Sequence, residues 1–276
     1  MNIIIFANCQ GKFFEHYLRE KMQKSQIKSI THISNHLSII DGKDFIKDRT
    51  TEKIKERDFY RMLNNTDLFI YQPIKSKYGK YTTDLSFKFN LLIFLKNGCK
   101  VISFPNIYNY AFSPIINNTN DLLNIAVIKK LKLQKKSLQD IFKLYDDNKL
   151  DFNYKKRYNK TIKILREKEQ NTIIKVCDII EKYKHIKRLF LSEIHPTNFL
   201  MVHCINQMFK LLKYNNYIIN PLSIKRELKT YNINKKSYNI IPISKYDIKY
   251  WNLNIQPDEN ADNFYKNIIS IIYNKI

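Results

Sequence analysis

Glycine, proline and tryptophan are scarce in this chain of 276 residues, which contains four glycines, seven prolines and one tryptophan. Four glycines are too few for most glycine-rich phosphate loops, and neither a Walker-type motif nor a GxGxxG fingerprint occurs. We therefore expect neither nucleotide hydrolysis nor dinucleotide redox chemistry. Disordered chains are commonly rich in glycine and proline, whereas 44% of these residues are hydrophobic and 13% aromatic, which indicates a folded protein.

Long hydrophobic runs and paired cysteines are also missing. Lys, Arg, Asn or Asp interrupts every apolar stretch before it reaches the roughly 18 to 20 residues of a membrane span, and the first residues do not resemble a signal peptide. The four cysteines, Cys9, Cys99, Cys177 and Cys204, lack CxxC spacing, which argues against a zinc site and against a secreted disulfide framework. We therefore expect a soluble, cytoplasmic protein with free thiols and no metal site.

Basic residues far outnumber acidic ones, since 48 Lys and Arg against 25 Asp and Glu give a formal net charge of +23. Such a charge is typical of proteins that bind nucleic acid, anionic lipid or a phosphorylated ligand. The lysines are spread along the whole chain, so we interpret most of the charge as general composition, with a local subset serving a phosphate-bearing ligand. A nucleic-acid-binding module is the alternative that the charge alone supports; we expect no specific nucleic-acid partner.

Apolar runs separated by helical patterns dominate the first 120 residues. Residues 2–7 form a β-branched run typical of a buried parallel strand, and apolar residues recur at helical spacing from Gly11 onward. Two further strands are predicted at residues 67–71 and 100–104, preceded by helices at residues 51–64 and 84–97. Strands that alternate with helices predict an α/β fold with a mostly parallel sheet flanked by helices, of the SGNH or Rossmann type.

Strand signals vanish after residue 120, where we predict a helical insertion over residues 121–186. Ser137 and Asp140 have the spacing of a helix N-cap with acidic support. The helical patterns of this part cover residues 122–133, 137–149 and 154–183. A returning strand at residues 188–192, a helix from His195 to about Tyr214 and a terminal helix at residues 261–273 follow. We expect one compact domain, with the sheet core in residues 1–120 and the return to the core and C-terminal helices in residues 187–276.

Polar residues follow the predicted strands at the ends where parallel sheets bind ligands. Cys9 lies between the first strand and a helix, where unpaired amides and the helix dipole favour an anion and can lower the pKa of a thiol. This position makes Cys9 a candidate nucleophile, and a buried structural cysteine is an equally good interpretation. The amides of Asn8, Gln10 and Gln72 are candidates for positioning a substrate or stabilising an oxyanion, and Gln72 has the alternative of satisfying loop backbone.

His195 also follows a predicted strand and precedes a helix, with Pro196 to stiffen the turn and Thr197 or Asn198 as a cap. We expect it to act as a general base, with Glu193 two residues upstream to orient the imidazole. A capping or surface histidine is the competing interpretation. His203, on the following helix, is the next candidate.

Three lysines follow the second core strand, and tyrosines are interleaved with them. Lys75, Lys77 and Lys80 are candidates for binding phosphate, although such loops are often merely solvated. Tyr108, in the loop after the third strand, is a candidate wall of a pocket, and an exposed aromatic loop that packs on the sheet edge is an equally good interpretation.

Taken together, these segments resemble the WcbI-type polysaccharide biosynthesis enzymes, whose first strand ends in Gly-Asn-Cys-Gln. Here the strand ends in Ala7-Asn8-Cys9-Gln10, so alanine replaces the family glycine and reduces the backbone freedom beside the cysteine. The other matching segments are Tyr71-Gln72-Pro73-Ile74, Phe104-Pro105-Asn106-Ile107-Tyr108 and His195-Pro196-Thr197-Asn198.

The resemblance implies a cytoplasmic enzyme of capsule or surface-polysaccharide assembly that transfers an acyl group, acetyl from acetyl-coenzyme A, to a carbohydrate acceptor. It also implies peripheral association with membrane-bound polysaccharide machinery. The layout looks like that of SGNH hydrolases, and this analogy gives Cys9 the nucleophile position and His195 the base position. Coenzyme A contacts are expected from Lys75, Lys77, Lys80, Tyr108 and Asn198. An SGNH-like esterase or deacetylase is the main alternative, and whether Cys9 is acylated or only positions the thioester stays open.

Overall fold

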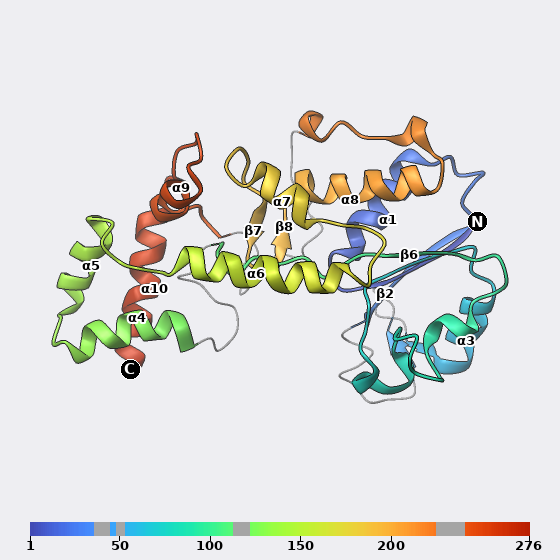
Figure 1. The fold of residues 1–276 in the computed structure, drawn as a ribbon, viewed down its shortest axis with the longest axis horizontal. Helices are drawn as coiled ribbons and strands as arrows, with labels where there is room; N and C mark the ends of the chain where they lie inside the picture. The colour runs from blue at the N-terminus through green and yellow to red at the C-terminus, as the bar shows by residue number, and fades with distance from the viewer. Residues whose placement is uncertain (36–44, 48–52, 113–121, 225–240) are drawn as a thin grey trace. The chain divides into compact units, whose positions relative to one another are not determined.

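The computed structural model describes residues 1–35, 45–47, 53–112, 122–224 and 241–276, and the chain divides into two compact units. The first unit comprises Met1–Asn106, Arg166–Val176 and Asn198–Asn232; the second comprises Ile107–Leu165, Cys177–Thr197 and Ile233–Ile276. Figure 1 labels the elements of both units. Over the described ranges, no helix combines the length and apolar character needed to cross a membrane.

A four-stranded parallel sheet forms the centre of the first unit, in the order β2-β1-β5-β6. The strands are β1 (Asn2–Ala7), β2 (Ser29–Ser34), β5 (Leu68–Tyr71) and β6 (Lys100–Ser103). The chain leaves β1 through α1 (Gly11–Lys21) to reach β2, and later adds β5 and β6 on the other side of β1. The predicted α/β fold with a mostly parallel sheet is confirmed.

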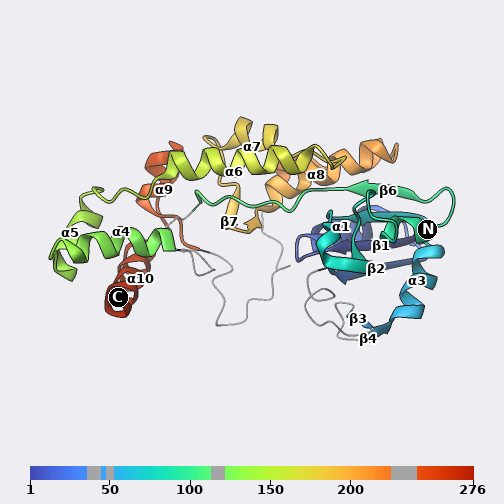
Figure 2. The ribbon, with the colours of Figure 1, turned by 60° about the horizontal axis from the view of Figure 1, so that its bottom comes forward.

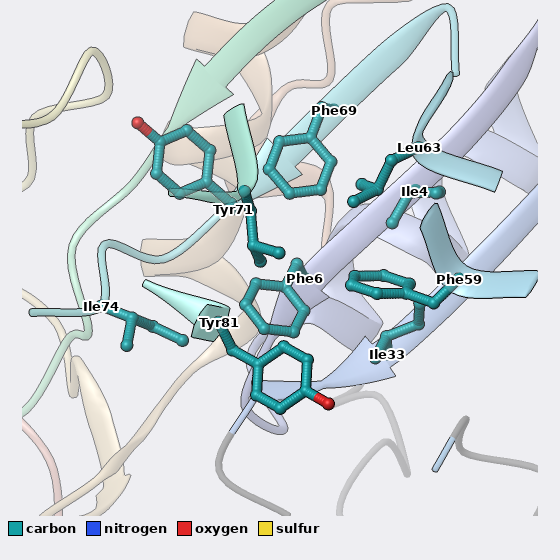
Figure 3. Packing of buried hydrophobic residues seen from close by; sticks show 10 residues of the cluster. Ile4, Phe6, Ile33, Phe59, Leu63, Phe69, Tyr71, Ile74 and Tyr81 are labelled. Atoms are coloured by element: carbon teal, nitrogen blue, oxygen red, sulfur yellow. The ribbon is translucent and has the colours of Figure 1, made fainter. Parts of the chain in front are cut away.

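The sheet is buried on both faces, which explains why β1 is a continuous apolar run rather than an alternating one. Ile4 and Phe6 face a cluster that includes Phe59 and Leu63 of α3 (Glu56–Asn64), as Figure 3 shows. On the other face lie α1 and α8 (Asn198–Leu211), which contact each other.

The second unit is mainly helical and contains a small sheet of its own. In this sheet β7 (Phe190–Ser192) pairs antiparallel with β8 (His195–Pro196). Ser137 and Asp140 form the predicted capping box at the start of α5. The helices are α4 (Leu122–Leu133), α5 (Leu138–Asp146), α6 (Tyr154–Glu169), α7 (Cys177–Tyr183), α9 (Lys245–Trp251) and α10 (Ala261–Lys275). The last turn of α6 belongs to the first unit.

Short elements complete the described chain. They are β3 (Phe45–Lys47), β4 (Lys53–Lys55) and the 3₁₀ turns η1 (Ser76–Tyr81), η2 (Leu91–Phe94), η3 (Asn215–Tyr217) and η4 (Pro221–Ser223). The predicted helix at residues 51–64 is present from Glu56 onward, and residues 51 and 52 lie outside the described part of the chain.

Three local predictions were wrong. The helix expected at residues 84–97 is absent: Asp84 accepts hydrogen bonds from the backbone and hydroxyl of Ser86, and the Asn90 side chain caps only the short η2. The helical pattern at residues 154–183 is split into α6 and α7 by a turn. The strand expected to return to the core is present as β7, but it pairs with β8 instead of the four-stranded sheet. The predicted domain division stays a prediction.

Candidate functional site

The strand order places a topological switch point at the carboxyl ends of β1 and β5. The connection after β1 leads to β2 on one side, whereas the connection after β5 leads to β6 on the other side. Neighbouring strands whose connections leave in opposite directions open a crevice between them, and ligands of open α/β sheets bind there. Residues 8–10 follow β1 and Gln72 follows β5, so the first unit contains the predicted strand-end residues at this switch point.

The turn that carries Cys9 is held by its own backbone. The amides of Gly11, Lys12 and Phe13 donate to the carbonyl oxygens of residues 8, 9 and 10, at 3.0, 3.2 and 3.2 Å. The amide of Gln10 donates to the Asn8 side-chain oxygen at 2.9 Å. These amides are therefore engaged, and the expectation that unpaired first-turn amides would attract an anion to Cys9 does not hold for them.

Side-chain amides join the ends of three strands. Gln72 accepts from the Asn8 backbone amide at 2.9 Å and donates to the Gln10 side chain at 3.0 Å, where it is buried. Asn8 donates from its side chain to Asn106, which follows β6, at 3.0 Å. The structure thus brings Asn8, Gln10 and Gln72 together, and it connects them in a way that shapes the turn around Cys9.

His32, on the neighbouring strand β2, also holds this turn and was not identified from the sequence. Its ring is buried, and Nε2 lies 3.1 Å from the carbonyl oxygens of both Ala7 and Asn8. Because both neighbours are acceptors, Nε2 must carry the proton. The missed signal was the strand itself, since the sequence of β2, Ser-Ile-Thr-His-Ile-Ser, alternates too weakly to indicate a core strand.

Gly11 makes room for this histidine. A Cβ atom added at Gly11 would lie 2.6 Å from His32 Nε2, 2.9 Å from Ile5 Cγ2 and 3.0 Å from Ala7 Cβ. The first helical residue after the cysteine turn is therefore restricted to glycine by close packing. This restriction is steric and does not arise from an unusual backbone angle.

The four cysteines differ in their surroundings. Cys9 and Cys99 are half-buried, whereas Cys177 and Cys204 are buried. Burial raises the pKa of the Cys99 thiol, and it raises that of Cys204 to about 12. A high thiol pKa reduces the reactive thiolate, so these two cysteines are poor nucleophiles at neutral pH.

The predicted cofactor residues are divided between the units. Lys75 and Lys77 are exposed in the first unit, and Asn198 is buried at the start of α8; the side chain of Lys80 lies outside the described part of the chain. Lys168, near the end of α6, has a pKa lowered by burial and then by repulsion from Lys75. These two lysines therefore form a like-charged pair that the sequence did not reveal.

His195 lies in the second unit, buried in the β7–β8 hairpin. Its Nδ1 lies 2.6 Å from the hydroxyl oxygen of Ser192, a residue that the sequence analysis did not select. Burial lowers the pKa of His195 to about 4, so the imidazole is neutral at physiological pH.

Glu193 is buried, and its backbone oxygen accepts from the Asn109 amide at 2.8 Å. Tyr108 is buried in the same unit, with its ring centroid 4.7 Å from that of Tyr110.

Cys9 belongs to the first unit and His195 to the second, so their cooperation in one active site stays a prediction. The orienting role of Glu193 also stays a prediction. In the described residues, no group of three or more His, Cys, Asp or Glu side chains is arranged to hold a metal ion.

Known proteins share the fold and part of the sequence pattern of this chain. Comparison with curated proteins gives no match. The fold is similar to a solved structure of WcbI, described as a polysaccharide biosynthesis enzyme in a native form without a disulfide bond between coenzyme A and one of its cysteines. The two are 14% identical, with a TM-score of 0.61 over 99% of this chain and 94% of the other. The family model of the polysaccharide biosynthesis enzyme WcbI matches residues 44–216, more than half of the chain. The chain therefore belongs to the WcbI family of polysaccharide biosynthesis enzymes.

Proposed function

We propose that this enzyme transfers an acyl group, acetyl in the first instance, from coenzyme A to a carbohydrate hydroxyl during surface or capsule polysaccharide assembly in the cytoplasm. The observation that carries the proposal is the half-buried Cys9 on a turn braced by His32 and Gln72 at the switch point between β1 and β5. The solved WcbI structure of the same fold is described as a native form without a disulfide bond between coenzyme A and one of its cysteines.

In this proposal the turn holds the thioester, and the cofactor phosphates contact nearby lysines. The like-charged pair Lys75 and Lys168 supports this role, because an anion between two cations relieves their repulsion. Lys77, Lys80, Tyr108 and Asn198 remain proposed cofactor contacts.

The transfer breaks the thioester C–S bond and forms a C–O ester bond. His195 takes the proton from the acceptor hydroxyl, and the departing coenzyme A sulfur receives a proton to leave as a thiol. Only a neutral imidazole can accept this proton, and the lowered pKa of His195 keeps its ring neutral at neutral pH. Asn8 is the proposed donor to the developing oxyanion, with Gln10 and Gln72 positioning it.

An esterase or deacetylase uses water in place of the carbohydrate acceptor, and the neutral His195 beside Ser192 suits that reaction as well. Release of acetate from an acetylated saccharide without coenzyme A would favour this second function. Ping-pong kinetics would indicate an acylated Cys9, whereas a requirement for both substrates at once would indicate direct transfer.

The proposal is tested by mapping iodoacetamide labelling with mass spectrometry, with and without coenzyme A. Cys9 is expected to react fastest of the four thiols, since two are buried and burial raises the pKa of Cys99. Coenzyme A is expected to protect Cys9 and to leave the labelling of Cys99 unchanged, which makes Cys99 the internal control. Labelling of Cys9 that is slower than that of Cys99 would contradict an activated Cys9 thiolate, and labelling unaffected by millimolar coenzyme A would contradict the proposal.

A further inference from the structure

The second unit contains a cavity of about 660 Å³ that the catalytic proposal does not use. It is lined by residues 150–156 together with Asn159 and Tyr250, all within this unit. A volume of this size suits a small-molecule ligand. Residues 150–153 before α6, the first turn of α6 and Tyr250 of α9 supply the lining, and Figure 2 shows α9 beside the start of α6.

One wall of the cavity is an aromatic surface with a rigid support. The rings of Tyr250 and Tyr154 stack with centroids 4.6 Å apart and planes inclined by 23°. Tyr154 is buried, and its hydroxyl donates at 3.0 Å to Asp247. Asp247 is itself fixed by the capping box with Ser244 at the start of α9. Tyr250, which remains half-buried, therefore lines the cavity with a ring whose position is held from behind.

Polar and charged side chains complete the lining. Lys155 and Lys156 are exposed, and in the described residues neither forms an ion pair. Asn153 and Asn159 add exposed amides, which can donate to and accept from hydroxyl groups. Asp151 is the single acidic residue of the lining, and its carboxylate accepts from the Asn153 backbone amide at 2.8 Å.

We infer that this cavity binds an anionic saccharide, a sugar that carries a carboxylate or a phosphate. An aromatic ring packs against the apolar face of a pyranose, the asparagine amides bind hydroxyl groups, and two lysines neutralise the acidic group. A nucleotide base would also stack on Tyr250, but the paired amides and the polysaccharide family of the chain favour a sugar. The inference goes beyond the proposed reaction and does not depend on coenzyme A or Cys9.

The chain provides a built-in reporter for this site. Trp251 is the sole tryptophan, and its ring lies 4.7 Å from that of Tyr250 in an edge-to-face contact. Tryptophan emission is therefore measured during titration with cellobiouronic acid and with cellobiose, which differ only in a carboxylate. We expect a saturable change, with cellobiouronic acid binding about fivefold more tightly at low salt and losing this advantage at high salt.

Variants separate the aromatic and the charged contributions. Tyr250→Ala is expected to weaken binding of both sugars by about 2- to 10-fold, whereas Tyr250→Phe retains it. Lys155→Gln with Lys156→Gln is expected to abolish the preference for the acidic sugar. The control pair is Lys160→Gln with Lys163→Gln, exposed on the same helix but outside the cavity lining, and it should leave the preference intact.

Three results would overturn the inference. The first is no saturable change in Trp251 emission and no calorimetric heat at about 10 mM cellobiouronic acid. The others are tighter binding of UMP than of the sugar, or an equal loss of the preference for the acidic sugar in the control pair. Each of these outcomes is independent of whether coenzyme A protects Cys9, so the saccharide site and the proposed reaction can fail separately.

Discussion

Replacing His195 by alanine is expected to lower kcat for acetyl transfer by about 10²- to 10⁴-fold, the usual contribution of a general base. The affinity for coenzyme A should change little, because the base is proposed to act on the acceptor hydroxyl. The measurement is steady-state kinetics together with calorimetric binding of coenzyme A.

A second variant separates catalysis from folding. Alanine leaves the buried Ser192 hydroxyl without the Nδ1 partner that lies 2.6 Å away, which costs about 1 to 3 kcal/mol of stability. His195→Asn retains a polar atom near Ser192 but has no basic nitrogen, so it should lose activity to the same extent with a smaller loss of stability. A variant that melts several degrees lower yet keeps near-normal turnover would show that His195 is structural, and His203→Ala would then be the next variant to assay.

The pH dependence has a defined sign. The pKa of His195 in the folded protein, about 4, lies below the value of about 6.5 for an unperturbed histidine. The unfolded chain therefore binds more protons between these two values, and His195 contributes stability above about pH 6.5 that is lost as the pH falls toward 4. The same lowered pKa implies that activity does not fall as the pH is lowered through 6.5, because the imidazole of His195 is still unprotonated there.

Replacing Gly11 by alanine is expected to destabilise the protein by about 1 to 3 kcal/mol, although alanine is the better helix former by about 1 kcal/mol. The added methyl group would lie 2.6 Å from His32 Nε2, and the buried ring can move aside only by losing its contacts with the carbonyl oxygens of Ala7 and Asn8. Displacement of this ring should also move the Cys9 turn. We therefore expect a lower urea midpoint together with altered alkylation of Cys9.

A double variant identifies the cause. Adding His32→Ala to Gly11→Ala removes the closest contact, so the two changes together should destabilise less than the sum of the single changes. Glu20→Ala, at an exposed position of α1, is the control and should change stability by no more than about 0.5 kcal/mol. A stabilised Gly11→Ala protein, or strict additivity with His32→Ala, would contradict the packing of this turn.

Elements with strong local signals were predictable from the sequence. The continuous apolar run of β1 identified the buried strand, and Ser137 with Asp140 identified the start of α5. The same capping spacing in Ser244 and Asp247 would have revealed α9, a helix that the sequence analysis did not predict. The helix predicted at residues 84–97 failed because local side-chain hydrogen bonds of Asp84 and Asn90 compete with helix formation.

The candidate site was predictable only where it is contiguous in the sequence. Asn8, Gln10 and Gln72 could be selected because parallel strands end at one edge of a sheet. His32 and Lys168 could not, because their roles depend on strand pairing and on the end of a distant helix. The Ser192 contact depends on the irregular pairing of β7 with β8, which no spacing rule predicts.

The most direct test of the central claim is a thermal-shift titration of the intact chain with coenzyme A and acetyl-coenzyme A. A ligand at 100 times its dissociation constant stabilises a folded protein by about 2.7 kcal/mol, so the melting temperature should rise in a concentration-dependent manner. We predict such a rise for both ligands, with Lys75→Ala requiring higher concentrations. An unchanged melting temperature at millimolar coenzyme A would contradict the claim that this enzyme uses coenzyme A.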